Sequence, residues 1–526
     1  KMDCNVKSDL QIGVECFVNA NKKYWANDLG TTGEDGWIYV LHTLHSEFTV
    51  SLVEDIVAKG IQAKEHLPIV SVISGRADEM MGLMDVVDAS FGIEQRFHPS
   101  YHDYHNEEIE NLAAKMAAKT YGDKDGLIGL AYRGVRFGDA LYDDIIRGGS
   151  GRNRGKIFNC FEISRERYCA FIRNALAIID QAYELFEEKR PRYLITTEYF
   201  YTKALYAHVA NVLGAKILLT FGDCPDVIVQ VDPGKYKLSE IKYADLIRIE
   251  MEKCLQRKLI DDTYDEDLFV LSEDDEKAIE HPSWCSKRKN VFILPHAFGD
   301  SPREACRHNI YHDYLEWFLD TMRIIKGITD VNWIIKDHPW AHYYKQESYV
   351  KAIFENNKAE NIYLIDKDLA GINIKDYADC VLTCTGDAGI EYWAYGVPTI
   401  TVGNAYYCNW GISYQMRTLS EYENTLKNMH NLNAPSKQSM ELAKKYLTAW
   451  KCRYKYGDAF SKLIGEYRLK EAAVWKQSGT HYGALDSVDR QLGKLLHDFC
   501  KSFTNLLQKQ DLNLSPVYRL DHLVEI

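Results

Sequence analysis

Two parts of the chain alternate short apolar runs of strand length with longer stretches of helical spacing. In the first part, the runs lie at 37–41, 68–73, 192–197 and 215–220. Helices are expected between them, with long ones at 163–188 and 201–213. Strands that alternate with helices in this way form a parallel sheet covered by helices. The pattern therefore predicts an α/β domain that ends near residue 230.

A second series of the same kind starts at residue 290. Its expected strands lie at 290–294, 331–336, 362–365, 380–383 and 398–402. After about residue 430 only helices are expected, and the last one carries apolar side chains at helical spacing between Leu485 and Leu506. We interpret this stripe as a packing surface and not as a ligand site.

These patterns divide the chain into four regions. The regions are an N-terminal α/β domain at 1–230, a helical and charged linker at 231–288, a second α/β domain at 289–435, and a helical tail at 436–526 that packs back across the domains. The predicted fold class is α/β, with two Rossmann-like domains that face a cleft. Open parallel sheets bind ligands beyond the carboxyl ends of their strands, so a ligand is expected between the two sheets. Transferases, epimerases and binding proteins share this architecture, so it does not select a function.

The composition excludes several classes of protein. The 526 residues are 46% hydrophobic and 26% charged, as in ordinary globular proteins, and the net charge of −13 disfavours a protein that wraps nucleic acid. The 13 cysteines lack zinc-ligand spacing and are typical of reduced thiols in a cytosolic protein. We expect no membrane span and no signal peptide. The acidic run at 261–267 lacks the glycine and spacing of a calcium loop, so we interpret it as linker and expect no metal site.

The strongest local signal is the stretch at 383–398, where a strand ends and a helix begins. Thr385 and Gly386 form the expected turn, and Gly389 lies in the first turn of the helix. Helix N-termini present free N–H groups, and glycines let a phosphate or ribose approach the backbone. Glu391, one turn into this helix, is placed to accept hydrogen bonds from ribose hydroxyls. The alternative is an ordinary strand–helix–strand unit with glycines at its turns.

Two further strand ends of the second domain carry polar side chains. Lys336 and His338 end the strand that begins at residue 331, and a histidine there can donate to a phosphate oxygen and stabilise a departing nucleotide. His296, Asp300 and Ser301 follow the first strand of this domain. These three are expected either to contact the ligand or to cap their own loop.

Acidic residues follow two strands of the first domain. Glu198 comes directly after the strand at 192–197, where it is expected to act as a base or to bind the acceptor, or else to be an acid at a helix start. Asp223 is a second acidic candidate after the next strand. The segment 133–143 mixes charged and apolar residues, and we favour a structural role for it over a role in capping the cleft.

Residues 290 to about 426 resemble bacterial capsule polysaccharide biosynthesis proteins, which are related to the capsule Kdo transferases. The resemblance rests on residues 294–301 followed by 314–317, on 331–339, on 385–391, and on Gly396, Pro398 and Gly403. In the first domain, 133–143 also looks like a segment of these proteins. Asp387 departs from the pattern, because uncharged residues are commoner in this loop of the family, and an acid beside a phosphate is unfavourable unless it points away.

The resemblance implies a GT-B-like glycosyltransferase that uses a nucleotide-activated sugar and needs no metal or other cofactor. By the same resemblance, His338, Thr385 and Gly386 bind the phosphate of the donor. We therefore expect transfer of a sugar, for example from CMP-Kdo, to a growing surface polysaccharide, glycan or glycolipid acceptor. The alternatives are a polyol-phosphate transferase, a nucleotide-sugar epimerase, or a non-catalytic sugar-binding scaffold of a capsule assembly. The expected location is the cytoplasm, with peripheral contact at the inner membrane or with other glycan-assembly enzymes.

Overall fold

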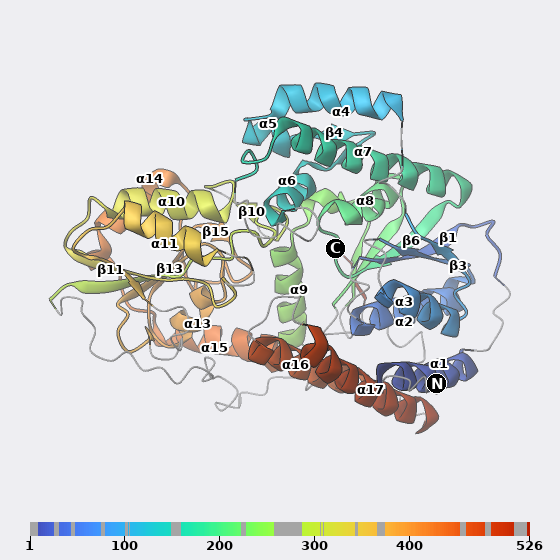
Figure 1. The fold of residues 1–526 in the computed structure, drawn as a ribbon. Coiled ribbons are helices and arrows are strands. Elements are labelled where there is room, and N and C mark those ends of the chain that lie inside the picture. The colour runs from blue at the N-terminus through green and yellow to red at the C-terminus, as the bar shows by residue number, and fades with distance from the viewer. Residues whose placement is uncertain are drawn as a thin grey trace, which may run out of the picture.

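The computed structural model describes most of the chain. The described residues are 9–25, 31–43, 48–74, 79–99, 104, 106–148, 159–221, 228–256, 287–305, 307–308, 310–341, 344, 346–365, 374–452, 459–478, 485–509 and 523–525. Two mostly parallel sheets, each in its own layered α/β unit, form the two ends of the molecule (Figure 1). The predicted α/β class with two Rossmann-like domains is therefore confirmed.

The first sheet has the strand order β17-β8-β7-β6-β1-β2-β3. Its strands are β1 (Trp37–His42), β2 (Ile69–Ile73), β3 (Gln95–Phe97), β6 (Pro191–Thr196), β7 (Lys216–Thr220), β8 (Ile228–Val231) and β17 (Leu523–Glu525). All neighbouring pairs are parallel except β7 and β8, which are antiparallel. The four long strands follow the apolar runs of the sequence to within one residue at each end.

Helices cover both faces of this sheet because the side chains of its strands alternate between them. Tyr39 and Leu41 belong to one apolar core, and Ile38 and Val40 belong to another. The first core is covered by α4 (Glu107–Thr120), α6 (Gly138–Arg147), α7 (Arg165–Glu188) and α8 (Leu205–Val212). The second is covered by α1 (Asp9–Tyr24), α2 (Phe48–Glu65), α3 (Glu79–Ser90), α16 (Ala459–Ser478) and α17 (Leu485–Lys509).

The second sheet is wholly parallel, with the order β12-β11-β9-β13-β14-β16. Its strands are β9 (Lys289–Ile293), β11 (Val331–Lys336), β12 (Ile362–Ile365), β13 (Cys380–Thr383), β14 (Thr399–Thr401) and β16 (Tyr414–Gln415). One face packs against α10 (Tyr314–Ile325), α11 (Glu347–Asn356) and α14 (Leu419–Lys427). The other packs against α13 (Ala388–Ala394), beside which lie α9 (Tyr243–Gln256) and α15 (Lys437–Cys452).

Short elements complete the described fold. They are α5 (Lys124–Ile128), the hairpin β4 (Ala131–Tyr132) and β5 (Val135–Arg136), the paired strands β10 (Arg307–His308) and β15 (Gly403–Asn404), and the 3-10 turns η1 (Thr202–Ala204), η2 (Leu238–Glu240) and η4 (Met429–Asn431). Within the described ranges, no helix is both long and apolar enough to cross a membrane.

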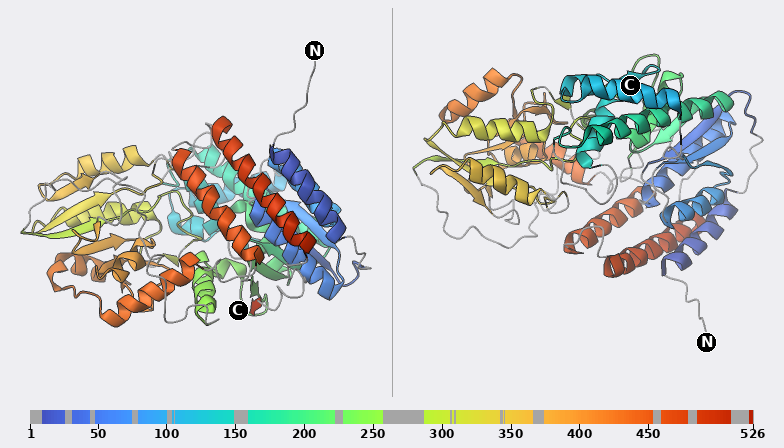
Figure 2. Two further views of the ribbon diagram at one scale, coloured as in Figure 1. Left: turned by 90° about the horizontal axis from the view of Figure 1, so that it is seen from below. Right: turned by 45° about the horizontal axis from the view of Figure 1, so that its top comes forward.

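The C-terminal helices α16 and α17 return to the first domain, where α17 lies beside α1 and α16 lies beside α17 (Figures 1 and 2). The ring of Phe503 is 5.3 Å from that of Phe17, and Phe499 is also buried, so the apolar stripe of the last helix is a packing surface as expected. The expectation of helices alone after residue 430 was wrong. β17 at 523–525 adds a parallel edge strand to β8. Runs of two or three residues are too short to show a strand period in a sequence.

Candidate functional site

Three loops of the second domain meet because the strands that precede them are neighbours. β11, β9 and β13 lie side by side and run in the same direction, so their carboxyl ends are at one edge of the sheet. His296 follows β9, His338 follows β11, and Thr385 follows β13. The sequence placed these residues at strand ends, and the sheet order brings the three ends together.

His296 lies at the centre of this group. Its Nε2 is 3.1 Å from Oγ1 of Thr385, and its ring stacks on Tyr314 at 4.2 Å between centroids and 9° between planes. The ring of His338 lies nearly parallel to that of His296, with centroids 6.5 Å apart. We call His296, His338, Thr385 and Gly386 the His–Thr cluster. Its members supply imidazole, hydroxyl and backbone groups at one sheet edge, the edge at which open sheets bind ligands.

His338 is held in one tautomer. The backbone N–H of Trp340 donates to Nδ1 of His338 at 3.1 Å, so Nδ1 carries no proton and the ring hydrogen must be on Nε2. Burial, followed by the charge of Lys336, lowers the pKa of His338 to about 4. At neutral pH the ring is therefore uncharged and offers one N–H donor. Lys336, the last residue of β11, is itself buried and supplies positive charge beside the ring.

The turn after β13 is packed around its glycines. A Cβ on Gly386 would be 2.9 Å from Oγ1 of Thr383 and 3.2 Å from Nε2 of His296, so only glycine fits between them. A Cβ on Gly389 would be 2.0 Å from the hydroxyl of Tyr407, which donates to the carbonyl oxygen of Gly386 at 2.6 Å. Gly389 thus makes room for Tyr407, a packing role that the sequence did not indicate.

The helix that follows this turn, α13, has only seven residues. Asp387 immediately precedes it, and its Oδ1 accepts a hydrogen bond from the hydroxyl of Tyr406 at 3.0 Å. This bond gives the unexpected acid of the loop a partner within the protein. Glu391 lies half-buried in the first turn of α13, at the position that the sequence indicated.

Gln346 joins the loops of His296 and His338, and sequence reasoning missed it. Its side chain is fully buried, and its Nε2 donates to the carbonyl oxygen of His296 at 3.0 Å and to Oδ1 of Asp337 at 2.8 Å. Its Oε1 accepts from the backbone N–H of Phe298 at 2.7 Å. A lone glutamine ahead of a helix carries no sequence signal for such a role, because all three partners come from other parts of the chain.

Asp300 and Ser301 contact the first domain and do not join the His–Thr cluster through any hydrogen bond among the described residues. Arg147 of α6 lies 3.7 Å from Asp300 and donates to the hydroxyl of Tyr201. That hydroxyl also accepts from Ser301. These contacts join the two domains, a role for Asp300 and Ser301 that the sequence did not indicate.

Glu198 lies two residues beyond β6 and pairs with Lys203, whose Nζ is 2.5 Å from Oε2 of the glutamate. The backbone carbonyl of Glu198 accepts hydrogen bonds from the hydroxyls of Thr43 and Thr196. The next helical turn, η1, begins only at Thr202, so Glu198 is not an acid at a helix start. Asp223 lies outside the described residues, as does the acidic run at 261–267.

The segment 133–143 joins the two domains. Asp139 pairs with Lys242 at 3.1 Å and with Arg303 at 2.9 Å. Asp143 accepts from the backbone N–H groups of Arg303 and Glu304 at 3.0 and 2.9 Å. These bonds support the structural role favoured from the sequence.

Two carboxyl groups in this contact are buried close to each other. Burial raises the pKa of Asp143 to about 8, against the two backbone N–H groups that favour its ionised form. Burial and then the charge of Asp143 raise the pKa of Glu304 well above its ordinary value, although Lys242 and the N–H of Tyr201 act in the opposite direction. Both shifts favour the protonated forms of these two acids.

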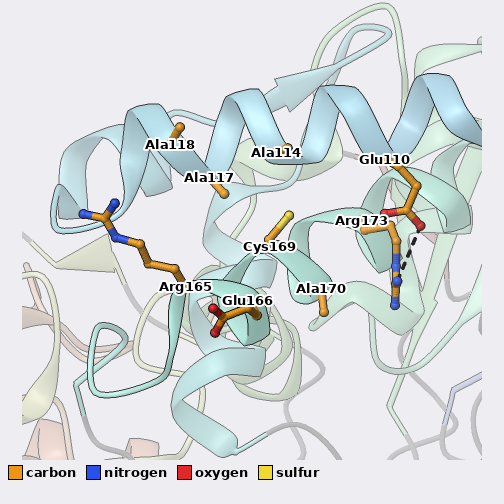
Figure 3. A pocket seen from close by; sticks show the side chains of 9 residues that line it. All are labelled: Glu110, Ala114, Ala117, Ala118, Arg165, Glu166, Cys169, Ala170 and Arg173. Atoms are coloured by element: carbon orange, nitrogen blue, oxygen red, sulfur yellow. Dashed lines mark hydrogen bonds and ion pairs between the residues drawn. The ribbon is translucent and has the colours of Figure 1, made fainter.

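A pocket of about 420 Å³ lies elsewhere, in the groove between α4 and α7 (Figure 3). Small side chains form its floor, among them Ala114, Ala117 and Ala170, and the ion pair of Glu110 with Arg173 lies at one end. None of the residues singled out from the sequence lines it. It therefore adds nothing to the candidate site.

Residues 273–447 match the family model of capsule polysaccharide biosynthesis proteins. The resemblance expected from the sequence is confirmed over this range, which contains every member of the His–Thr cluster. No curated protein matches the chain.

Several solved structures are similar to parts of the chain at low identity. Thermosulfurimonas dismutans KpsC, a beta Kdo 2,4 transferase, is 15% identical, covers 48% of this chain and 78% of its own, and has a TM-score of 0.28. S. aureus MnaA, in a co-structure with UDP, is 12% identical over 84% of this chain and 97% of its own, with a TM-score of 0.25. A glycosyltransferase from Rickettsia africae is 12% identical over 89% of this chain and 98% of its own, with a TM-score of 0.24. Because these TM-scores are low, the comparison with solved structures adds nothing to the sheet topology described above.

Proposed function

We propose that the protein is a metal-independent glycosyltransferase that moves a sugar from a nucleotide-activated donor to a growing surface polysaccharide or glycan. The observation that carries the proposal is the His–Thr cluster, which gathers hydrogen-bond donors at the carboxyl edge of the second sheet. Open α/β sheets bind nucleotides at this edge. The family match over 273–447 supports capsule saccharides as the substrate class. CMP-Kdo is the first donor to test.

The second domain would bind the nucleotide and stabilise its departure. When the bond between the anomeric carbon and the phosphate oxygen breaks, the electron pair leaves with the phosphate. Nε2–H of His338 and the hydroxyl of Thr385 can donate to the phosphate oxygens that gain charge. Lys336 adds positive charge behind His338, and Glu391 is placed for the ribose hydroxyls. Because His338 is neutral, it stabilises the phosphate by hydrogen bonding.

The first domain would bind the acceptor. The acceptor hydroxyl oxygen bonds to the anomeric carbon and loses its proton, for which Glu198 is the proposed base. Lys203 holds the carboxylate of Glu198 through the ion pair at 2.5 Å. Tyr201, Asp300 and Ser301 join this wall to the second domain, so closure of the interdomain contact positions the two halves of the site.

Nucleotide binding is the direct test. Thermal shift and calorimetry with CMP, CDP and UDP should find a nucleotide that stabilises the protein, by about 2.7 kcal/mol at a hundredfold excess over Kd. His338→Ala should weaken that binding or slow turnover by about tenfold or more. His430→Ala is the matched control, because His430 is an exposed histidine of the same domain that pairs only with Asp330 among the described residues. Equal nucleotide affinity and turnover in the two variants would contradict the proposal.

The chemistry is tested separately. Glu198→Gln should lower kcat by about a hundredfold while nucleotide affinity changes by no more than a few fold. Turnover should need no added Mg²⁺ or Mn²⁺, and the products should be a glycoside and the free nucleotide. Release of an epimerised sugar, or a requirement for an added cation, would contradict this mechanism.

A further inference from the structure

A histidine and three carboxylates are buried together in the first domain, away from the His–Thr cluster. His42 ends β1, Glu54 and Asp55 lie on α2, and Asp88 lies on α3. All four side chains are essentially inaccessible to solvent. Buried charges are rare unless they are paired or coordinate a metal ion, so the geometry of this group decides what it does.

The side chains of His42, Asp55 and Asp88 converge without hydrogen bonds to one another. Nε2 of His42 lies 3.4 Å from Oδ1 of Asp55 and 3.4 Å from Oδ1 of Asp88. One ligand atom from each residue lies within 4.8 Å of the other two. Neither Nε2 of His42 nor any carboxylate oxygen of Asp55 and Asp88 has a hydrogen-bond partner. A charged imidazole that donated to a carboxylate would be expected at about 2.7–2.9 Å.

The separation of 3.4 Å fits two ligands of one metal ion. Ligand atoms of a tetrahedral site stand about 1.63 bond lengths apart, and bonds of about 2.0–2.1 Å place them roughly 3.3–3.4 Å from each other. An imidazole nitrogen with carboxylate oxygens is a ligand set of Zn²⁺ and related transition-metal ions. Mg²⁺ and Ca²⁺ prefer oxygen ligands alone.

The other side of the imidazole has the partner that metal-bound histidines need. Nδ1 of His42 lies 2.7 Å from Oε2 of Glu54, which is short enough for a strong hydrogen bond. A histidine that binds a metal through one nitrogen commonly donates its other N–H to a carboxylate, which fixes the tautomer. Oε1 of Glu54 in turn accepts from the backbone N–H of Thr197 at 2.6 Å. Glu54 thus fixes the orientation of the ring, with Nε2 on the side of Asp55 and Asp88.

We propose that His42, Asp55 and Asp88 bind a divalent transition-metal ion, with Zn²⁺ the favoured species. With neutral His42, the ion and the buried Lys59 of α2 balance the charges of Asp55, Asp88 and Glu54. Since the ligands are inaccessible to solvent, the ion has a structural role and does not reach the substrate. Through Glu54 it fixes Thr197, and so the start of the loop that carries Glu198.

The alternative is an ion pair without a metal. Burial alone would lower the pKa of His42, but Asp88 and Asp55 hold it well above its ordinary value. Burial raises the pKa of Asp55 to about 8, so that Asp55 would be the protonated partner. In that arrangement Asp55→Asn would replace a neutral acid by its amide and leave the stability almost unchanged. A metal ligand replaced in the same way would lose the ion.

The experiment measures metal in the untagged protein, purified without chelator, by mass spectrometry of the elements. The wild type should hold about one equivalent, whereas Asp55→Asn and Asp88→Asn should hold little, and Glu54→Gln should weaken binding by about 10- to 100-fold. Asp85→Asn is the matched control, because Asp85 lies on α3 and pairs with the partly exposed His98. Its metal content should equal that of the wild type.

A second measurement covers variants that fail to fold. Wild-type protein stripped by prolonged dialysis against a strong chelator should melt at a lower temperature, and added Zn²⁺ should restore the melt where Mg²⁺ does not. Wild-type protein without bound metal, and with a melting temperature that Zn²⁺ and Mn²⁺ leave unchanged, would overturn the proposal. This result would not affect nucleotide binding at the His–Thr cluster, so the two proposals fail independently.

Discussion

Glu304→Gln should change the pH dependence of stability, because Glu304 is the buried acid at the contact between the domains. Glu304 is 5% exposed, and the charges of Asp143 and Asp139 raise its pKa further, whereas Lys242 and the N–H of Tyr201 lower it. A raised pKa means that the folded state binds a proton that the unfolded state releases at lower pH. The free energy of unfolding therefore falls as pH rises from the ordinary pKa of a glutamate towards the raised one.

The size of this change in the free energy of unfolding follows from the binding of one proton by the folded state. Each pH unit in this window removes up to about 1.4 kcal/mol from the free energy of unfolding, so two units, from pH 5.5 to 7.5, remove about 2–3 kcal/mol. Glutamine resembles the protonated acid and takes up no proton. Relative to the wild type, Glu304→Gln should therefore gain about 2–3 kcal/mol of stability between pH 5.5 and 7.5.

The assay is urea unfolding of both proteins at pH 5.5, 6.5 and 7.5, followed by tryptophan fluorescence. The difference between the two proteins isolates Glu304, because other groups titrate alike in both. Glu94→Gln serves as the control, since Glu94 is exposed in the first domain and should leave the pH dependence unchanged. If the curves for Glu304→Gln and the wild type stay parallel to within about 0.5 kcal/mol over this range, the buried proton does not exist.

Three further substitutions test the packing around the two sites. Gly389→Ala should cost about 1–3 kcal/mol through overpacking, because its Cβ would lie 2.0 Å from the hydroxyl of Tyr407; a thermal melt should show the loss of stability, and a nucleotide titration the loss of affinity. Gln346→Leu should remove three hydrogen bonds that hold the loops of the His–Thr cluster, and so weaken nucleotide binding by moving those loops. Calorimetry measures the affinity, and an unchanged affinity would remove Gln346 from the positioning of the site. Lys124→Met should cost about 3–5 kcal/mol at pH 7 by removing the cation 2.8 Å from the buried Asp313. Lys124 and Tyr142 hold the pKa of Asp313 below its ordinary value against burial, so the loss should shrink as the pH falls towards that lowered pKa; denaturation at pH 7 and at a series of lower pH values tests this.

The sequence predicted the long elements and the strand-end residues well for a physical reason. Buried parallel strands are apolar along their whole length, so β6 and β11 could be placed to within one residue. Once the strands are placed, the loops of His338 and Thr385 must lie at the same end of the sheet. The order of the strands within the sheet, which makes those loops neighbours, was not visible in the sequence.

What the sequence could not predict depends on contacts between distant parts of the chain. Gln346 became visible only with its three partners, and His42, Asp55 and Asp88 lie far apart in the sequence with no motif to join them. The tautomer of His338 depends on a backbone N–H two residues away. β17 is three residues long and pairs with a strand almost 300 residues earlier in the chain, so no local pattern could indicate it.

The return of α16, α17 and β17 to the first domain makes the second domain an insertion. α1 packs against α17, and β8 receives β17, so the first domain is built from both ends of the described chain. On the ribosome, the inserted domain can fold as soon as β16 and α15 have emerged. The first domain cannot be completed until α17 emerges, because α17 covers Phe17 on the apolar face of α1. Contacts between segments this distant in sequence form late. The second domain is therefore expected to complete its fold before the first domain, although most of the first domain precedes it in the sequence.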